Sequence, residues 1–257
     1  MRYLRTLLNQ LLPPIGAFIA LMIAWSGAKY AFSVQDFFVP YPWSVLTAGY
    51  RIQSELLQAT MLTGQAAVGG FSLSVFFGTI LAVLFAQFRV LRLGCFPYAV
   101  ILQTVPIVAI APLITYAYGA GFRSVVLISF IVSLFPIIAN MMAGLTSVPR
   151  GMRELFLLNR ATRLQTIMRL QIPHALPDLF TGMRTSGGLA VIGAIVGEFF
   201  AGNSSDGYGL GFMVPQRISQ FKADEAFAAV AMAISLGLIM FVSVAILRKI
   251  VLRDRTG

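Results

Sequence analysis

The stretch that decides the fold is RGMRELFLLNRATRLQTIMRLQIPHALPDLF, Arg150–Phe180, a charged segment that lies between long apolar runs. Only 11% of the whole chain is charged, yet this segment alone holds five arginines: Arg150, Arg153, Arg160, Arg163 and Arg169. Charged side chains are costly in the hydrocarbon of a bilayer, so the segment must lie in water. The apolar runs around it predict membrane spans, and the segment itself predicts a sizeable basic surface outside the bilayer.

Composition indicates an integral membrane protein. Of the 257 residues 58% are hydrophobic, and the mean hydropathy is +0.84, whereas a soluble domain has about a quarter charged residues. A spanning helix needs about 20 mostly apolar residues and a barrel strand about 10 of alternating polarity, so the long runs predict an all-α fold. No small-residue cleavage site follows the first run, so we expect it to be retained. We expect six spans, at Leu12–Phe32, Leu62–Gln87, Cys95–Tyr118, Ser124–Leu145, Gly182–Ala201 and Ala226–Leu247.

The net charge of the chain is +10, and its basic residues are expected to lie mostly on one side of the membrane. With the N-terminus inside, fourteen of the nineteen Lys and Arg residues fall on one side, the five arginines of the charged segment among them. Cytoplasmic loops carry such an excess, so both termini and the basic segment are expected in the cytoplasm. This distribution excludes nucleic acid as the reason for the charge.

The basic segment has the signals of two short helices. Pro149 suits the first turn of the first helix. Thr162 and Gln165 have capping-box spacing, which predicts that a second helix starts there. Asn159 is suited to the left-handed conformation that ends the first helix. Pro173 is expected to stop the second helix, together with Pro177, before the next span.

An apolar stripe runs beside the arginines of this segment, at Leu157, Ala161, Leu164 and Met168. Two interpretations of this surface remain open on the residues alone. The two helices insert into a groove on a partner protein, or they lie on lipid headgroups with the arginines facing anionic lipid.

The segment resembles the EAA loop of permease subunits of bacterial ABC importers. Glu154 matches the family's Glu, and Leu155 and Phe156 stand at the two usual alanines. Ala161 matches the Ala that follows the family's glycine, and Ile172–Pro173 matches the closing hydrophobic-Pro pair. Three further segments are similar to the nitrate, sulfonate and taurine branch of these permeases: Leu102–Gly121, Ser133–Pro149 and Leu189–Gly202.

The resemblance implies a type I importer permease of the MetI-like fold in a bacterial inner membrane. It implies one permease domain over residues 1–257, with a core at about 58–250 and a cytoplasmic coupling loop at 146–181. Its partners would be a cytoplasmic ATPase dimer, an extracytoplasmic solute-binding protein, a second permease copy and membrane lipid. ATP would bind the ATPase, and this chain would hold no cofactor.

Arg160 departs from the family pattern, because glycine is usual at that position. The glycine makes the turn between the two loop helices, and arginine is costly if the backbone there needs a positive φ. We expect Asn159 to take that turn one residue earlier. Leu155 and Phe156 make the surface bulkier than two alanines would.

Polar residues and prolines within the spans are candidates for the translocation path: Gln103, Pro106, Asn140 and Glu198. Hydrogen bonding between helices is the alternative role for the amides, and helix packing is the alternative role for the proline kink. For Glu198 the alternative is contact with interfacial water or pairing with a base such as Arg217. The spacing of Gly193 and Gly197 favours close helix packing at the core of the bundle.

Two other function classes are less well supported. A secondary transporter or channel, with a lipid-facing basic loop, predicts coupling charges at mid-membrane, and Glu198 lies near a span end. An enzyme predicts clustered His, Asp, Glu or Cys, and the chain has one His, one Cys and no phosphate-binding Gly-Lys-Ser/Thr loop. No catalytic or metal site is therefore expected. The expected solute is small and either anionic, as nitrate, sulfonates and taurine are, or heterocyclic, as a pyrimidine vitamin precursor is.

Overall fold

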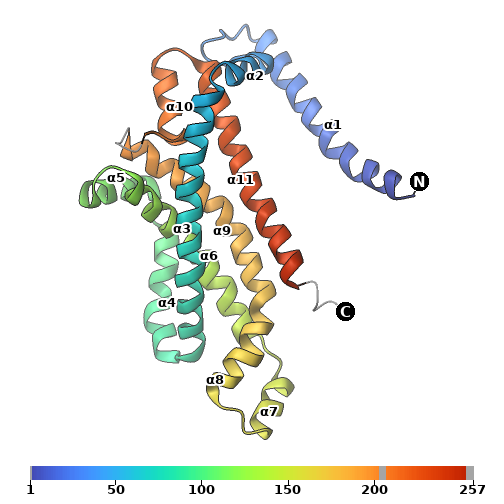
Figure 1. Ribbon diagram of the computed structural model, residues 1–257, viewed down its shortest axis with the longest axis vertical. Coiled ribbons are helices and arrows are strands. Elements are labelled where there is room, and N and C mark those ends of the chain that lie inside the picture. The colour runs from blue at the N-terminus through green and yellow to red at the C-terminus, as the bar shows by residue number, and fades with distance from the viewer. Residues whose placement is uncertain (1, 203–206, 253–257) are drawn as a thin grey trace. The chain divides into compact units, whose positions relative to one another are not determined.

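The computed structural model describes residues 2–202 and 207–252, with side chains from Leu12 onward, and this part of the chain is almost entirely helical (Figure 1). The helices are α1 (Arg2–Ala31), α2 (Pro42–Arg51), α3 (Gln53–Gln87), α4 (Arg89–Thr104), α5 (Ile107–Tyr118), α6 (Phe122–Thr146), α7 (Arg150–Leu158), α8 (Arg163–Thr166), the π-helical segment η1 (Ile167–Gln171), α9 (Ile172–Ala201), α10 (Leu210–Ser219) and α11 (Ala223–Leu252).

Five helical stretches of the described residues are long and apolar enough to cross a membrane, in α1, α3, α6, the run from α8 through α9, and α11. The expected third span is present as two helices, α4 and α5, which are bent by 101° at a short break. The all-helical fold with six spans is confirmed if this bent pair counts as one. Pro106 lies in the break, because proline has no N–H to continue the helical ladder. Pro112 and Pro136, by contrast, lie within α5 and α6.

The chain forms two compact units. The smaller contains residues up to Leu56 together with Met213–Ala231. The larger contains Leu57–Phe212 together with the residues from Met232 onward. Each unit is described by itself.

Small residues bring α6 and α9 together in the larger unit. A Cβ atom at Gly193 would lie 2.7 Å from Cα of Ser129, and one at Gly182 would lie 2.7 Å from the carbonyl oxygen of Pro136. Such contacts leave no room for a side chain, so the two backbones approach as closely as glycine allows. This agrees with the core position expected for the fifth span.

Serine hydroxyls add hydrogen bonds between α3, α6 and α9. Ser74 Oγ donates to the carbonyl of Phe130 at 2.8 Å, and Ser129 Oγ to the carbonyl of Ala190 at 2.8 Å. Ser186 Oγ donates to the carbonyl of Ser133 at 2.6 Å. These short side chains donate to backbone carbonyls of a neighbouring helix without holding the helices apart, which suits packing where lipid offers no partners.

In the smaller unit, a buried lysine fixes the exit from α1. Lys29, which is 4% exposed, pairs with Asp36 at 2.6 Å and donates to the carbonyls of Val34, at 3.1 Å, and Val39. Its ammonium also lies 4.5 Å from the ring centre of Tyr41. A buried ammonium needs all of its donors satisfied, and the chain after α1 folds back to supply the acceptors.

An ion-pair network joins the other elements of the smaller unit. Arg217 on α10 pairs with Glu55 on α3 and, at 3.0 Å, with the buried Glu225 on α11. Arg51, the last residue of α2, pairs with Glu225 at 3.0 Å and with Asp224 at 3.1 Å. The network joins the ends of α2, α3, α10 and α11. Removing one partner would leave an uncompensated buried charge, so the ion pairs oppose separation of these helix ends.

Helix α2 begins at Pro42, because the first turn of a helix needs no N–H there. The expectation that Pro173 and Pro177 stop the second loop helix is wrong: α8 runs through η1 into α9, and Pro177 lies inside α9. The N–H of Ile172 bonds to the carbonyl of Ile167, five residues back, and this wider π turn admits Pro173 just after it.

Candidate functional site: the two-helix loop and the buried glutamate

The first loop helix, α7, ends in a Schellman motif. The N–H of Arg160 donates to the carbonyl of Leu157 at 2.9 Å, and the N–H of Ala161 donates to the carbonyl of Phe156 at 3.0 Å. These two bonds satisfy carbonyls that a helix end leaves unpaired. The motif requires a left-handed residue immediately after the C-cap residue, Asn159.

Arg160 itself takes that left-handed conformation, with φ of 50°. Asn159 keeps a negative φ, with φ of −81° and ψ of 12°, and is not left-handed. The expectation that Asn159 takes the turn is therefore wrong. The bonding pattern of the Schellman motif fixes the position of the turn, so the arginine bears the strain that glycine would avoid.

The second loop helix begins as predicted. Thr162 and Gln165 form both bonds of a capping box, at 2.8 Å and 3.2 Å. Arg153 donates to the carbonyl of Thr146 at the end of α6, at 3.1 Å, and Gln87 at the end of α3 donates to Gln171 at 2.5 Å. The loop is thus attached to the ends of two other helices as well as being continuous with α9.

The loop exposes an unusual amount of apolar surface. Leu155 and Leu164 are more than half exposed, and Leu158 is 80% exposed. Exposed apolar side chains in a water-facing segment mark an interaction surface. The stripe expected across Leu157, Ala161 and Leu164 is interrupted by the turn at Arg160 and is divided between α7 and α8.

The seven residues assigned to the coupling loop lie in α7, in the turn that follows it and in the first turn of α9. Glu154, Leu155 and Arg160 are exposed, and Phe156 and Ala161 are half-buried beside them. Ile172 and Pro173 are half-buried in the first turn of α9.

The four candidate path residues lie in three separate places. Gln103 and Pro106 border a cavity at the break between α4 and α5. Asn140 donates to the carbonyl of Pro136 in its own helix, at 2.8 Å. Glu198 lies in a different pocket, near the C-terminal end of α9.

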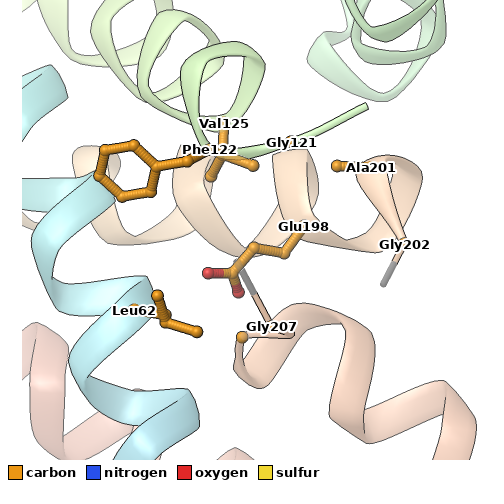
Figure 2. A pocket seen from close by; sticks show the side chains of 9 residues that line it. Leu62, Gly121, Phe122, Val125, Glu198, Ala201, Gly202 and Gly207 are labelled. Carbon is orange, nitrogen blue, oxygen red and sulfur yellow. The ribbon is translucent and has the colours of Figure 1, made fainter. Parts of the chain in front are cut away.

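Figure 2 shows the Glu198 carboxylate directed away from α9 toward Leu62 and Gly207. Glu198 is only 6% exposed. Its Oε2 accepts from the hydroxyl of Thr63 and from the N–H of Gly211, each at 2.9 Å. Thr63 Oγ1 in turn accepts from the N–H of Leu210 at 2.9 Å. The carboxylate and the hydroxyl thus cap the first turn of α10.

Two glycines make this contact fit. A Cβ atom at Gly209 would overlap the Glu198 carboxylate, and one at Gly211 would overlap the carbonyl of Ile195. The sequence signal is the Gly-Leu-Gly run at 209–211, although nothing in its spacing connects it with Glu198. Arg217, the basic partner considered for Glu198, forms its ion pairs with Glu55 and Glu225 instead.

These features define a class of protein. Five long apolar helices and one bent apolar pair, a buried polar contact at the end of α9 and a two-helix loop with exposed leucines describe a multi-pass membrane transport component. Among the described residues, no group of three or more His, Cys, Asp or Glu side chains is placed to hold a metal ion.

The chain belongs to the family of binding-protein-dependent transport system inner membrane components, whose model matches residues 74–256. It is 32% identical over 251 residues to the riboflavin transport system permease protein RibX of Chloroflexus aurantiacus, covering 94% of this chain and 90% of that protein. It is 30% identical over 244 residues to the formylaminopyrimidine transport permease protein ThiX of Halalkalibacterium halodurans, covering 95% and 96%. It is 25% identical over 182 residues to the nitrate import permease protein NrtB of Synechocystis, covering 71% and 65%. The chain is therefore a multi-pass inner membrane permease subunit of an ABC importer.

Proposed function

We propose that the two-helix loop, residues 146–181, is the contact through which a separate cytoplasmic ATPase drives this permease. The observation that carries the proposal is the exposure of Leu155, Leu157 and Leu158 on α7. A lipid-facing loop would also expose leucines, but α8 is continuous with a span through η1, so movement at the loop passes directly into α9. ATP would bind the ATPase, and this chain would need no cofactor of its own.

The solute we propose is a heterocyclic vitamin or vitamin precursor. The relatives named for riboflavin and formylaminopyrimidine are at least 30% identical over more than nine tenths of this chain. The relative named for nitrate matches 71% of it at 25% identity. An extracytoplasmic binding protein would deliver the solute to a path between two copies of this permease, each with both termini in the cytoplasm. The whole chain would act as one domain, with its core at about 58–250.

Co-purification tests the loop contact. Tagged chain is extracted from its native host in mild detergent with an ATP analogue, and its partners are identified by mass spectrometry. We expect an ATPase subunit with the unaltered chain and its loss with Leu155→Asp. The matched control is Val90→Asp, which places the same charge on an exposed residue at the start of α4, outside the loop.

An ATPase recovered equally with Leu155→Asp would refute the contact. A folded chain that always comes alone would favour a secondary transporter or channel with a lipid-facing loop. A binding protein in the same sample would identify the solute.

A further inference from the structure

A cavity lies at the break between α4 and α5, walled also by α6 and α9. Its volume is about 430 Å³, and Gln103, Pro106, Ile110, Phe135 and Ile192 are among its lining residues. Small-molecule sites typically occupy about 300–1,000 Å³. Figure 1 shows α5 turned sharply away from the line of α4.

The break leaves a backbone acceptor at the cavity wall. The carbonyl of Leu102 would normally accept from the residue four positions on, but that residue is Pro106, which has no N–H. The N–H of Val105 bonds to the carbonyl of Ile101 instead. Unpaired carbonyls at membrane depth are tolerated where they line a wet cavity, and interrupted spans mark binding sites in transporters.

The wall carries no charged side chain. Its polar groups are the amide of Gln103 and the hydroxyl of Thr104, and its other side chains are apolar, with Phe135 and Ile131 among them. No cationic side chain lines the cavity to compensate an inorganic anion for the water that it would lose on entering. A flat, uncharged ring would fit between the apolar walls, with a ring N–H on the carbonyl of Leu102 and its own acceptors on the Gln103 amide.

We propose that this cavity is a solute contact site of the permease, selective for uncharged planar heterocycles that have ring N–H donors. The proposal rests on the proposed transport function and adds the residues that recognise the solute. Gln103 is the specificity-determining side chain, because its amide supplies donors and an acceptor in one group.

Cysteine labelling tests the site in the full-length chain reconstituted in lipid vesicles. The single native cysteine is exposed and is first removed as Cys95→Ala. Ile110→Cys then places a thiol on the cavity wall, and Ile234→Cys places one on an exposed face of α11 away from it. A small, water-soluble methanethiosulfonate should modify the first thiol quickly and the second slowly, because only the cavity thiol meets water.

Riboflavin and nitrate are the protecting probes. We expect riboflavin to slow modification of Ile110→Cys and nitrate to leave it unchanged. Adding Gln103→Leu should raise the riboflavin concentration for half protection about fivefold, the effect of one net hydrogen bond, without changing unprotected labelling.

A cavity thiol that is never modified would overturn the proposal, as would protection by nitrate or by neither probe. The co-purification experiment, repeated on the Cys95→Ala chain, decides the proposed function separately. An ATPase recovered there while riboflavin gives no protection would leave the transport function standing and overturn only the cavity assignment.

Discussion

Removing the Glu198 carboxylate should loosen the start of α10 by an amount that follows from its contacts. In Glu198→Ala, the N–H of Gly211 loses its acceptor at 2.9 Å and stays buried. Thr63 keeps an alternative, because its hydroxyl lies 3.0 Å from the carbonyl of Ala59. One buried donor is therefore left unsatisfied, at a cost of about 1–3 kcal/mol.

Hydrogen exchange measures this cost where it occurs. If the first turn of α10 opens locally, about 1–3 kcal/mol corresponds to exchange about 5- to 140-fold faster for the amides near Gly211. Mass spectrometry of a peptide that covers residues 207–214, with the chain in lipid nanodiscs, gives this ratio. Peptides from α7 should exchange as before.

The Glu198→Gln variant keeps a hydrogen-bond acceptor and removes the negative charge. Both hydrogen bonds use Oε2, and an amide oxygen in that place accepts both, so this variant should exchange nearly as the unaltered chain does. Equal acceleration in the Gln and Ala variants would refute the hydrogen-bond account and assign the role to the charge. No acceleration in Glu198→Ala would show that the carboxylate does not hold α10.

Two further predictions concern glycine and its absence. Gly193→Ala places a methyl 2.7 Å from Cα of Ser129 and should destabilise the α6–α9 contact by about 1–3 kcal/mol in thermal denaturation. The control is Gly188→Ala, which has nothing within 4 Å and should stabilise the chain slightly, because alanine favours a helix interior. A Gly193→Ala chain as stable as the control would contradict the close packing. Arg160→Gly should relieve the left-handed strain at φ of 50° and stabilise the end of α7 by about 1 kcal/mol. The gain should appear as slower amide hydrogen exchange at residues 155–161. Faster exchange there would show that the arginine side chain holds the turn.

Local signals predicted local structure well. The capping box at Thr162 and Gln165 depends on residues three apart, so its spacing is visible in the sequence. The turn was placed one residue too early, because residue preference favours Asn159 while the bonding pattern requires the residue after the C-cap. The break at Pro106 was foreseen only as a kink, since proline removes a donor whether or not the helix resumes in the same direction.

Contacts between residues far apart in the chain could not be predicted from the sequence. Glu198 meets Thr63 across 135 positions, and nothing in either neighbourhood identifies the other. The π turn before Pro173 was missed because proline after a helix usually signals its end, whereas a bond five residues back lets the helix continue. The spans were predictable, because their length and apolarity are set by the thickness of the bilayer.

The uninterrupted helix from Arg163 to Ala201 can convert a small rotation at one end into a large displacement at the other. It contains 39 residues, and at about 1.5 Å per residue it is roughly 58 Å long. A tilt of about 10° about its Arg163 end would sweep Glu198, roughly 53 Å away, through about 9 Å. Since Glu198 holds the first turn of α10, a modest rotation at one surface of the membrane becomes a displacement of nearly a helix diameter at the other.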